Sequence, residues 1–550
     1  MNVAELMIKC LETEGVKYIF GVPGEENEDF LFALENSSIQ FIPTRHEQGG
    51  AFMADVWGRL TGKAGVCLAT LGPGATNLMT AIADAHLDKA PLVAITGQGS
   101  SDRLHHESHQ VIDIIKMMEP ITKWNASIGS GEVVSEMVHK AFKLAQMEKP
   151  GATHLELPEN IAAQKVPDNL APIVSNKIYR PIADAQALQT ALEVLRAAKR
   201  PIILAGNGAI RTRASKALTD FATSLNIPVG STFMAKGAIS DKLDQSLGAI
   251  GLGFEDYIIE AFYKADVVLC IGYDVAEYPP SQWNQKQTKK IIHIDIEPAE
   301  VYKSYVPEIE VVSDVANAIK LIHAQLEDNP FDSWFTSIRD RIVSSIHSYG
   351  HEEDNTTFSA PSVIDVVRQI LPDDSLLISD VGSHKMWIAR NYPTYIPNGC
   401  IISNGLASMG IALPGLVAAD LVDKNRPVVS IMGDGGAMMN IQELETAVRL
   451  GVKGVFIILN DNNYGLIEWK QEMSEGKSFG TKLGNPNFKK LAESFNIEAH
   501  IPTDTKNLKS LLTDAIEQKK LMLLEIPIET KVNDQLVQTL SDYFKNNTDA

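Results

Sequence analysis

Two acidic residues, each placed after an apolar segment, are spaced as a cation site would require. Asp434 lies in the run GDGG that follows PVVSIM (427–432), and Asp461 follows VFIIL (455–459) and one asparagine. Such β-branched segments are typical of buried strands, and the stretch between them favours a connecting helix. Because crossovers between parallel strands are right-handed, both strands end at one edge of the sheet. We therefore predict that the two acids are neighbours.

The predicted helix between these strands has recognisable start and stop signals. We expect Asn440 to cap it, with Glu443 completing a capping box, and Gly451 to end it in a left-handed conformation. Its apolar face would consist of Ile441, Leu444, Ala447 and Val448.

The residue types at this edge indicate which ligand it would hold. Oxygen ligands from Asp434, Asp461 and a carbonyl at about Asn463 suit a hard cation, Mg²⁺ before Ca²⁺. The glycine turn offers free N–H groups to a phosphorylated ligand. A bare GDG is more often an ordinary turn, but the complete strand–helix–strand unit favours the metal site.

Composition and charge exclude several classes of function. The 550 residues carry a formal net charge of −20 with a pI near 5.1, and such a field repels nucleic acid and acidic membrane surfaces. The four cysteines lie far apart without a CxxC pair, which argues against a disulfide framework and a structural zinc site (Cys10, Cys67, Cys270, Cys400). No apolar run approaches the ~20 residues that a membrane crossing needs, and the first residues lack the apolar centre of a signal peptide. We expect a cytoplasmic protein.

Alternating apolar strands and amphipathic helices predict an α/β chain of three doubly wound, parallel-sheet domains. We expect these domains at 1–165, 185–330 and 355–530, followed by a polar tail at 531–550. The Pro-rich stretch 163–185 reads as a linker.

A third acid, Glu47, begins a predicted helix in the first domain. Ala51, Phe52 and Ala54 look buried there, so the carboxyl group is expected to be partly desolvated, which would raise its pKa. A partly protonated acid can hydrogen-bond a heteroaromatic nitrogen. The alternative is a surface ion pair with Arg45.

The stretch from GDGG (433–436) to NDNN (460–463) resembles the cofactor motif of thiamine diphosphate enzymes, and RHEQ (45–48) with GPGATN (72–77) resembles their acetolactate synthase family, the acetohydroxyacid synthase large-subunit type. The resemblance covers nearly the whole chain. It implies a pyrimidine-binding, a middle and a diphosphate-binding domain. It also implies that Asp434, Asp461 and Asn463 hold Mg²⁺, with Asp461 standing where many relatives have an amide, and that Glu47 is the catalytic acid at pyrimidine N1′.

The same resemblance implies the rest of the cofactor site. Residues of the first domain would face the pyrimidine across a subunit interface (Val22, Gly24, Pro73, Asn77). Residues of the third domain would contact the diphosphate (Gly382, Ser383, His384, Gly435, Gly436), and Met409 would bend the cofactor into a V. A homodimer would then be the smallest active unit, and a homotetramer is common in the family.

The resemblance favours a magnesium- and thiamine diphosphate-dependent acetolactate synthase acting on pyruvate, in branched-chain amino acid or acetoin metabolism. Two pyruvates would form 2-acetolactate and CO₂ through a hydroxyethyl enamine. The alternatives are a decarboxylase that releases aldehyde, for which His105 and His106 would be the proton relay, and a flavin-linked pyruvate oxidase. A catalytically silent cofactor binder is disfavoured because the catalytic acid and the metal acids are present.

Five further positions or segments bear on substrate and flavin. Gln110 matches a family position near the substrate, although a surface amide is the alternative. Lys470 could pair with a pyruvate carboxylate or be a solvated helix charge. The run GNGAIR (206–211) lacks the third glycine of a dinucleotide motif, Asp295 is more typical of a turn than of a ribose ligand, and 267–284 resembles the flavin-free catabolic enzymes, so FAD is not expected.

Overall fold

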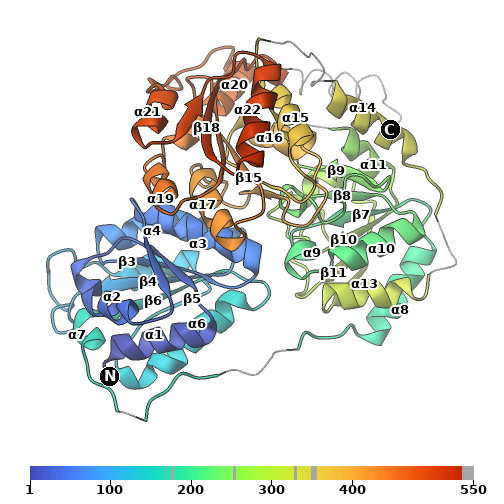
Figure 1. Ribbon diagram of the computed structural model, residues 1–550. Helices are drawn as coiled ribbons and strands as arrows, with labels where there is room; N and C mark the ends of the chain where they lie inside the picture. Colours follow the sequence, from blue (N-terminus) through green and yellow to red (C-terminus); the bar gives the residue numbers. More distant parts are fainter. Residues whose placement is uncertain (168, 175–178, 252–255, 327–330, 349–355, 535–550) are drawn as a thin grey trace.

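The structure is a computed structural model that describes residues 1–167, 169–174, 179–251, 256–326, 331–348 and 356–534. It contains three six-stranded sheets, one in each successive third of the chain (Figure 1). Every ladder between the named strands of the described residues is parallel, with helices on the faces of the sheets. The expected α/β fold class is confirmed. The C-terminal part of the expected tail, 535–550, lies outside the described residues.

The first sheet has the strand order β2-β1-β3-β4-β6-β5. Helices α1 (Val3–Glu14) and α6 (Val134–Gln146) pack on each other beside it, and α3 (Glu47–Thr61) packs on α4 (Pro73–Leu87). Strand β5 is a half-buried strand at the edge of this sheet. The strands are β1 (Tyr18–Gly21), β2 (Gln40–Pro43), β3 (Gly65–Ala69), β4 (Leu92–Gln98), β5 (Trp124–Ser127) and β6 (Ala152–Pro158).

The middle sheet has the strand order β12-β11-β10-β7-β8-β9. Its strands are β7 (Pro201–Ala205), β8 (Val229–Ser231), β9 (Ser246–Ala249), β10 (Val267–Ile271), β11 (Lys290–Asp295) and β12 (Ile309–Val312). Helices α8 (Ala185–Arg196), α10 (Ser215–Leu225), α11 (Tyr257–Lys264), α13 (Val315–His323) and α14 (Thr336–His347) surround it.

The third sheet has the strand order β14-β13-β15-β16-β18-β17. Its strands are β13 (Leu376–Ser379), β14 (Cys400–Ile402), β15 (Val428–Gly433), β16 (Gly454–Asn460), β17 (Glu498–His500) and β18 (Leu521–Pro527). Its helices are α15 (Ala360–Ile370), α16 (Ser383–Asn391), α17 (Ala412–Val422), α18 (Asp434–Ala437), α19 (Glu443–Arg449), α20 (Gly465–Glu475), α21 (Phe488–Ser494) and α22 (Thr505–Glu517).

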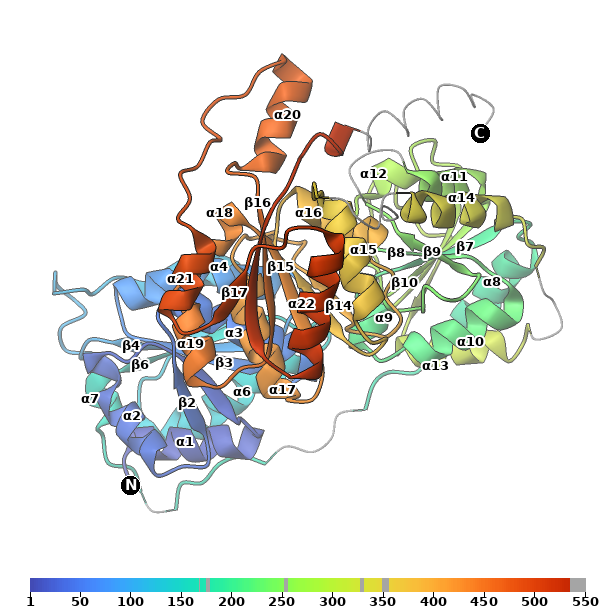
Figure 2. The same ribbon diagram turned by 45° about the horizontal axis from the view of Figure 1, so that its top comes forward.

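The first and third domains share a hydrophobic core where α3 packs against α17. Phe52 and Val56 from the first domain belong to the same buried cluster as Ile411 and Leu416 from the third. Figure 2 shows these two domains side by side, with the middle domain beyond the third. The continuous core fixes where α3, and therefore Glu47, lies relative to the third sheet.

All four cysteines are buried free thiols, in line with the expected absence of a disulfide framework. In the part of the chain that the structure describes, no helix combines the length and the apolar character that a bilayer crossing requires.

Candidate functional site

The carboxyl edge of the third sheet brings the two predicted metal acids together. Strands β15 and β16 pair in parallel register, with Gly433 opposite Leu459, so both chains leave the sheet at the same edge. Asp434 and Asp461 line one cavity of about 170 Å³. Burial and the neighbouring charge of Asp434 raise the pKa of Asp461 to about 7, and burial also raises the pKa of Asp434. A bound cation would relieve this repulsion.

The oxygen donors around these acids fit a hard cation. Asn463 lines the cavity, and its Oδ1 atom is buried without a hydrogen-bond partner among the described residues, whereas its amide nitrogen donates to the Asp461 carbonyl at 3.0 Å. Among the described residues, no cluster of three or more His, Cys, Asp or Glu side chains could hold a metal. Two carboxylates and an amide oxygen therefore need phosphate or water oxygens to complete a shell, as Mg²⁺ commonly has.

The connecting segment differs from the predicted capped helix. Helix α19 begins at Glu443, and its N-cap is Gln442, without a side-chain capping bond. The Asn440 amide instead donates to the Gly410 carbonyl at 2.7 Å, and the Glu443 carboxylate crosses to the first domain. The predicted capping box is therefore wrong, because tertiary partners take both side chains. Gly451 does adopt the predicted left-handed conformation, with φ of 60°.

Glycines shape the rest of this cavity. A Cβ atom on Gly435 would lie 2.8 Å from the Tyr464 ring, and one on Gly436 would lie 2.7 Å from the Asp380 carboxylate. Gly382 precedes the first turn of α16, which carries Ser383 and His384. Close backbone approach beside the N-terminus of a helix suits a phosphate.

His384 presents a neutral ring to this cavity. Burial lowers the pKa of His384 to about 4, and its Nε2 atom is buried without a partner among the described residues. The ring also donates a hydrogen bond to the Asp380 backbone carbonyl, so the second nitrogen of the neutral imidazole is left as an acceptor toward the cavity.

Asp380 is a site residue that the sequence did not reveal. Its buried carboxylate accepts the backbone N–H of Gly410 at 3.0 Å and that of Ala412 at 3.1 Å. Asp380 thereby holds the loop that carries Met409, which lines the cavity. The only signal was its place directly after an apolar strand.

Every third-domain residue that the resemblance assigned to cofactor or metal lines this one cavity. These residues are Gly382, Ser383, His384, Met409, Asp434, Gly435, Gly436, Asp461 and Asn463. Asn485 is a neighbour that was missed, and its amide donates to the Asp434 carboxylate at 2.6 Å.

The first-domain candidates gather around Glu47, which begins α3. The Glu47 side chain is 12% exposed and accepts a hydrogen bond of 3.0 Å from the Asn77 amide on α4. Within the described residues no ion pair joins Glu47 to Arg45, and the His46 ring nitrogen lies 4.0 Å from the Glu47 carboxylate. The alternative of an Arg45 ion pair is therefore not what this structure contains.

The turn before α4 brings two more candidates close together. Pro73 is the first residue of α4, and a Cβ on Gly72 would lie 2.7 Å from the Gln110 carbonyl. Val22 and Gly24 follow β1, and a Cβ on Gly24 would overlap the Thr70 side chain. The third-domain cavity of the same chain is lined by none of the first-domain candidates (Val22, Gly24, Glu47, Pro73, Asn77, Gln110).

The turn after β7 has one backbone N–H engaged by a side chain of the protein itself. The Asn207 backbone N–H donates to the Glu277 carboxylate at 3.0 Å. Burial and the charge of Asp274 raise the pKa of Glu277 to about 8. Glu277 thus engages one N–H donor that a diphosphate at this turn would use.

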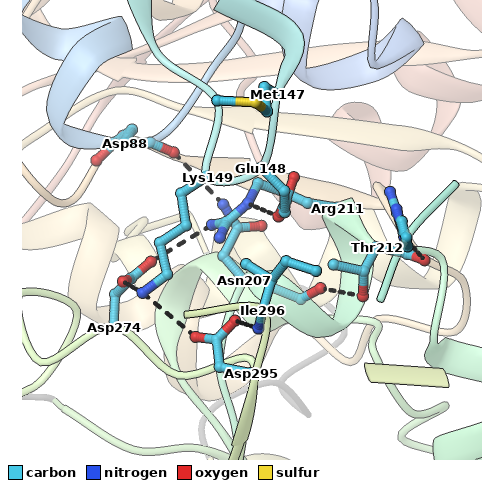
Figure 3. A network of polar contacts seen from close by, with 12 residues as sticks. Asp88, Met147, Glu148, Lys149, Asn207, Arg211, Thr212, Asp274, Asp295 and Ile296 are labelled. Carbon is cyan, nitrogen blue, oxygen red and sulfur yellow. Dashed lines mark hydrogen bonds and ion pairs between the residues drawn. The ribbon is translucent and has the colours of Figure 1, made fainter. Parts of the chain in front are cut away.

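Several other charged groups around this turn form ion pairs with each other (Figure 3). Lys149 contacts Asp274 at 2.5 Å and Asp295 at 3.3 Å, and Arg211 contacts Glu148 at 3.2 Å. Asp295 also accepts the N–H of Ile296 at 2.7 Å, as a turn residue does.

Three residues whose roles the sequence left undecided lie on the surface of the chain. His105 and His106 are exposed, and their ring nitrogens are 3.2 Å apart. Lys470 is exposed on α20 and lines a second cavity, next to the first.

Comparison with known proteins gives matches along most of the chain. Family models match in order: "Thiamine pyrophosphate enzyme, N-terminal TPP binding domain" at residues 1–117, "central domain" at 188–322 and "C-terminal TPP binding domain" at 380–526. The chain is 32% identical to "Acetolactate synthase" of Bacillus subtilis (strain 168), over 97% of this chain and 94% of the relative. It is also 32% identical to "Acetolactate synthase, catabolic" of Raoultella terrigena, over 98% and 97%, and 33% identical to "Probable acetolactate synthase large subunit" of Methanococcus aeolicus, over 96% and 92%.

Proposed function

This chain belongs to the thiamine pyrophosphate enzyme family, with acetolactate synthases as its close relatives, and from that premise we propose that it makes 2-acetolactate from pyruvate. Two pyruvate anions and one proton give one 2-acetolactate anion and one CO₂. The observation that carries the proposal is the single cavity lined by every third-domain residue expected from the motifs.

The third domain supplies the groups that would hold the cofactor, thiamine diphosphate (thiamine pyrophosphate). When bound, it supplies a nucleophilic carbon and an electron sink for decarboxylation of a 2-oxo acid. Asp434, Asp461 and Asn463 would hold Mg²⁺ against the diphosphate, and the diphosphate would also accept bonds from the glycine turns and the first turn of α16 (Gly382, Ser383, His384, Gly435, Gly436). Met409 would support the ring system from the cavity wall.

Glu47 would act on the pyrimidine ring by holding a proton at N1′. Asn77 orients its carboxylate through the 3.0 Å hydrogen bond, and its low exposure limits competition from water. Val22, Gly24 and Pro73 would flank the ring, with Gln110 near the substrate.

We propose that the two halves of each site come from two subunits of a homodimer, or of a homotetramer built from such dimers. The support is that no first-domain candidate lines the third-domain cavity of its own chain. We further propose domain boundaries at 1–165, 185–330 and 355–530, and a cytoplasmic location, which suits four buried free thiols.

We propose that the enzyme works without FAD. The β7 turn donates its N–H to Glu277, so its residues do not fit the diphosphate of a dinucleotide. Lys149 and Arg211, two cations near that turn, already pair with Asp274, Asp295 and Glu148.

Mass spectrometry of the products from pyruvate tests the proposed reaction, and an absorbance scan of the purified protein tests for flavin. We expect acetolactate and CO₂ in equal amounts and no flavin band. Acetaldehyde as the main product would instead support a decarboxylase with His105 and His106 as relay, and acetate with reduced flavin would support an oxidase.

A further inference from the structure

A second cavity adjoins the proposed cofactor cavity and contains two lysines. It has a volume of about 520 Å³, and its lining includes Lys385, Lys470, Asn404, Phe233, Met386 and Met473. Val381, Gly382, Ala407 and Leu466 line both cavities, so a molecule in the second cavity would lie next to the cofactor. In Figure 2, α20, which carries Lys470, extends past the carboxyl end of β16.

Lys385 is held in place by neutral oxygen atoms. Its ammonium group donates to the Ser403 carbonyl and to the Asn404 side-chain oxygen, both at 3.1 Å. Among the described residues, no carboxylate lies within 4.0 Å of Lys385 or of Lys470. An ammonium group has three donors, so Lys385 keeps one for a ligand.

The positive charge of the Lys385 ammonium group is not fully balanced by the acids around it. Burial and the nearby charge of Lys470 lower the pKa of Lys385 to about 8, against the opposing effect of Asp88 and Asp84. Among the described residues Lys385 and Lys470 form no ion pair, although Asp88 and Asp84 act on Lys385 at longer range, and the two lysines repel each other. An anion in the cavity would relieve their repulsion.

We propose that Lys385, assisted by Lys470, binds the carboxylate of the acceptor 2-oxo acid and so determines specificity for an acid acceptor. This inference rests on the proposed function. A cation held on the donor carboxylate would stabilise the ground state that must lose CO₂ and would slow the reaction. The acceptor carboxylate, in contrast, persists into the product, so a fixed cation can hold it throughout the joining step.

A competition between a charged and an uncharged acceptor tests this assignment. Purified holoenzyme receives pyruvate as donor with acetaldehyde as added acceptor, and mass spectrometry measures acetolactate against acetoin formed directly from acetaldehyde. For Lys385→Met we expect the acetolactate-to-acetoin ratio to fall about ten- to hundredfold, because charge-assisted hydrogen bonds are lost. Lys385→Arg should keep the ratio within about fivefold of wild type, because the cation is retained.

Two further variants keep the test independent of folding. Lys470→Gln, on an exposed helix surface, should lower the ratio about three- to tenfold even if Lys385→Met fails to fold. Lys477→Met, an exposed lysine just beyond α20, is the matched control and should leave the ratio unchanged. Binding of oxamate, an inert analogue of pyruvate, to the holoenzyme should weaken in parallel with the ratio.

The possible outcomes separate this inference from the proposed function. A wild-type enzyme that makes no acetolactate overturns the proposed function and the acceptor site together. A wild-type enzyme that makes acetolactate, with an unchanged ratio in folded Lys385→Met and in Lys470→Gln, overturns the acceptor site alone. An equal loss of both products in Lys385→Met, without rescue by arginine, would mean that Lys385 merely supports the 403–404 loop.

Discussion

The carboxylate of Glu443, in the third domain, accepts the backbone N–H of His46, in the first domain, at 3.0 Å. It also accepts the N–H of Arg45 at 3.0 Å, and a Cβ on Gly49 would lie 2.6 Å from its Oε1 atom. Glu47 directly follows Arg45 and His46 in the chain. One buried acid of the third domain therefore fixes the turn that presents the proposed catalytic acid.

These hydrogen bonds to the Glu443 carboxylate make a pH-dependent contribution to the free energy of unfolding. Burial, partly offset by its hydrogen bonds, raises the pKa of Glu443 to about 7, above the roughly 4.3 of an unfolded glutamate. Between these values the folded protein binds more protons than the unfolded chain. The contribution of Glu443 is thus fully present below about pH 4 and is lost as the pH rises through about 7.

We predict that Glu443→Gln has a free energy of unfolding close to that of wild type near pH 5. At higher pH the variant should be more stable than wild type. The relative gain should be on the order of 1 to 3 kcal/mol in free energy of unfolding by about pH 8, because the amide cannot ionise. Denaturant unfolding of both proteins across this pH range measures it. Parallel pH profiles for the two proteins would show that Glu443 does not titrate between folded and unfolded states.

We predict that Asp434→Ala loses Mg²⁺-dependent retention of thiamine diphosphate, weakening it on the order of a hundredfold or more, because a charged metal ligand is removed. Asp461→Asn keeps an oxygen ligand and should weaken it much less. Gel filtration with cofactor analysis of the eluted protein, at fixed Mg²⁺, measures retention. Asp423→Ala, an exposed acid before β15, is the control, and cofactor held equally well by Asp434→Ala would remove the metal assignment.

We predict that Glu47→Gln binds the cofactor normally but exchanges the thiazolium C2 proton at least about a hundredfold more slowly, because the acid that activates the pyrimidine is neutralised. Quenched deuterium exchange followed by NMR measures this rate in the holoenzyme. Glu35→Gln, at an exposed helix end, should exchange at the wild-type rate. An unchanged rate in Glu47→Gln would refute its assigned role.

We predict that preference for pyruvate over acetaldehyde as acceptor depends on pH. The pKa of Lys385 is lowered to about 8, so its charge is present below that value and is lost above it. The groups that face it are Asp84, Asp88 and Lys470. The acetolactate-to-acetoin ratio should be flat below about pH 7 and fall through about pH 8, whereas Lys385→Arg should stay flat. Because it compares two products, this ratio does not change when a titrating group affects the formation of both products equally.

Local patterns predicted the long buried strands but missed the short ones. Strands β15 and β16 carry runs rich in β-branched residues, and the parallel rule then placed Asp434 beside Asp461. Strands such as β8 (VGS) and β17 (EAH) are too short and polar to leave a periodic signal. Their pairing comes from neighbouring strands of the same sheet, which no local window contains.

The residues of the site were likewise predictable only where local sequence determines their role. Glycines and acids at strand ends, such as Gly382 and Asp434, could be predicted because turn geometry and ligand chemistry restrict those positions. Glu443, Asp380 and Lys385 could not, because their roles depend on partners elsewhere in the fold. Glu443 and His46 are 397 positions apart in the chain, so the local capping pattern was misleading where a tertiary contact prevailed.

The central claim is that a divalent cation between Asp434 and Asp461 holds thiamine diphosphate at the third sheet while Glu47 of another subunit reaches its pyrimidine. A crystal structure of the protein with thiamine diphosphate and Mn²⁺ in place of Mg²⁺ tests this most directly, through the anomalous signal of manganese. We predict a peak coordinated by both carboxylates and the diphosphate, with Glu47 of the neighbouring subunit at N1′. A peak elsewhere, or cofactor bound with the two carboxylates pointing away from it, would contradict the account.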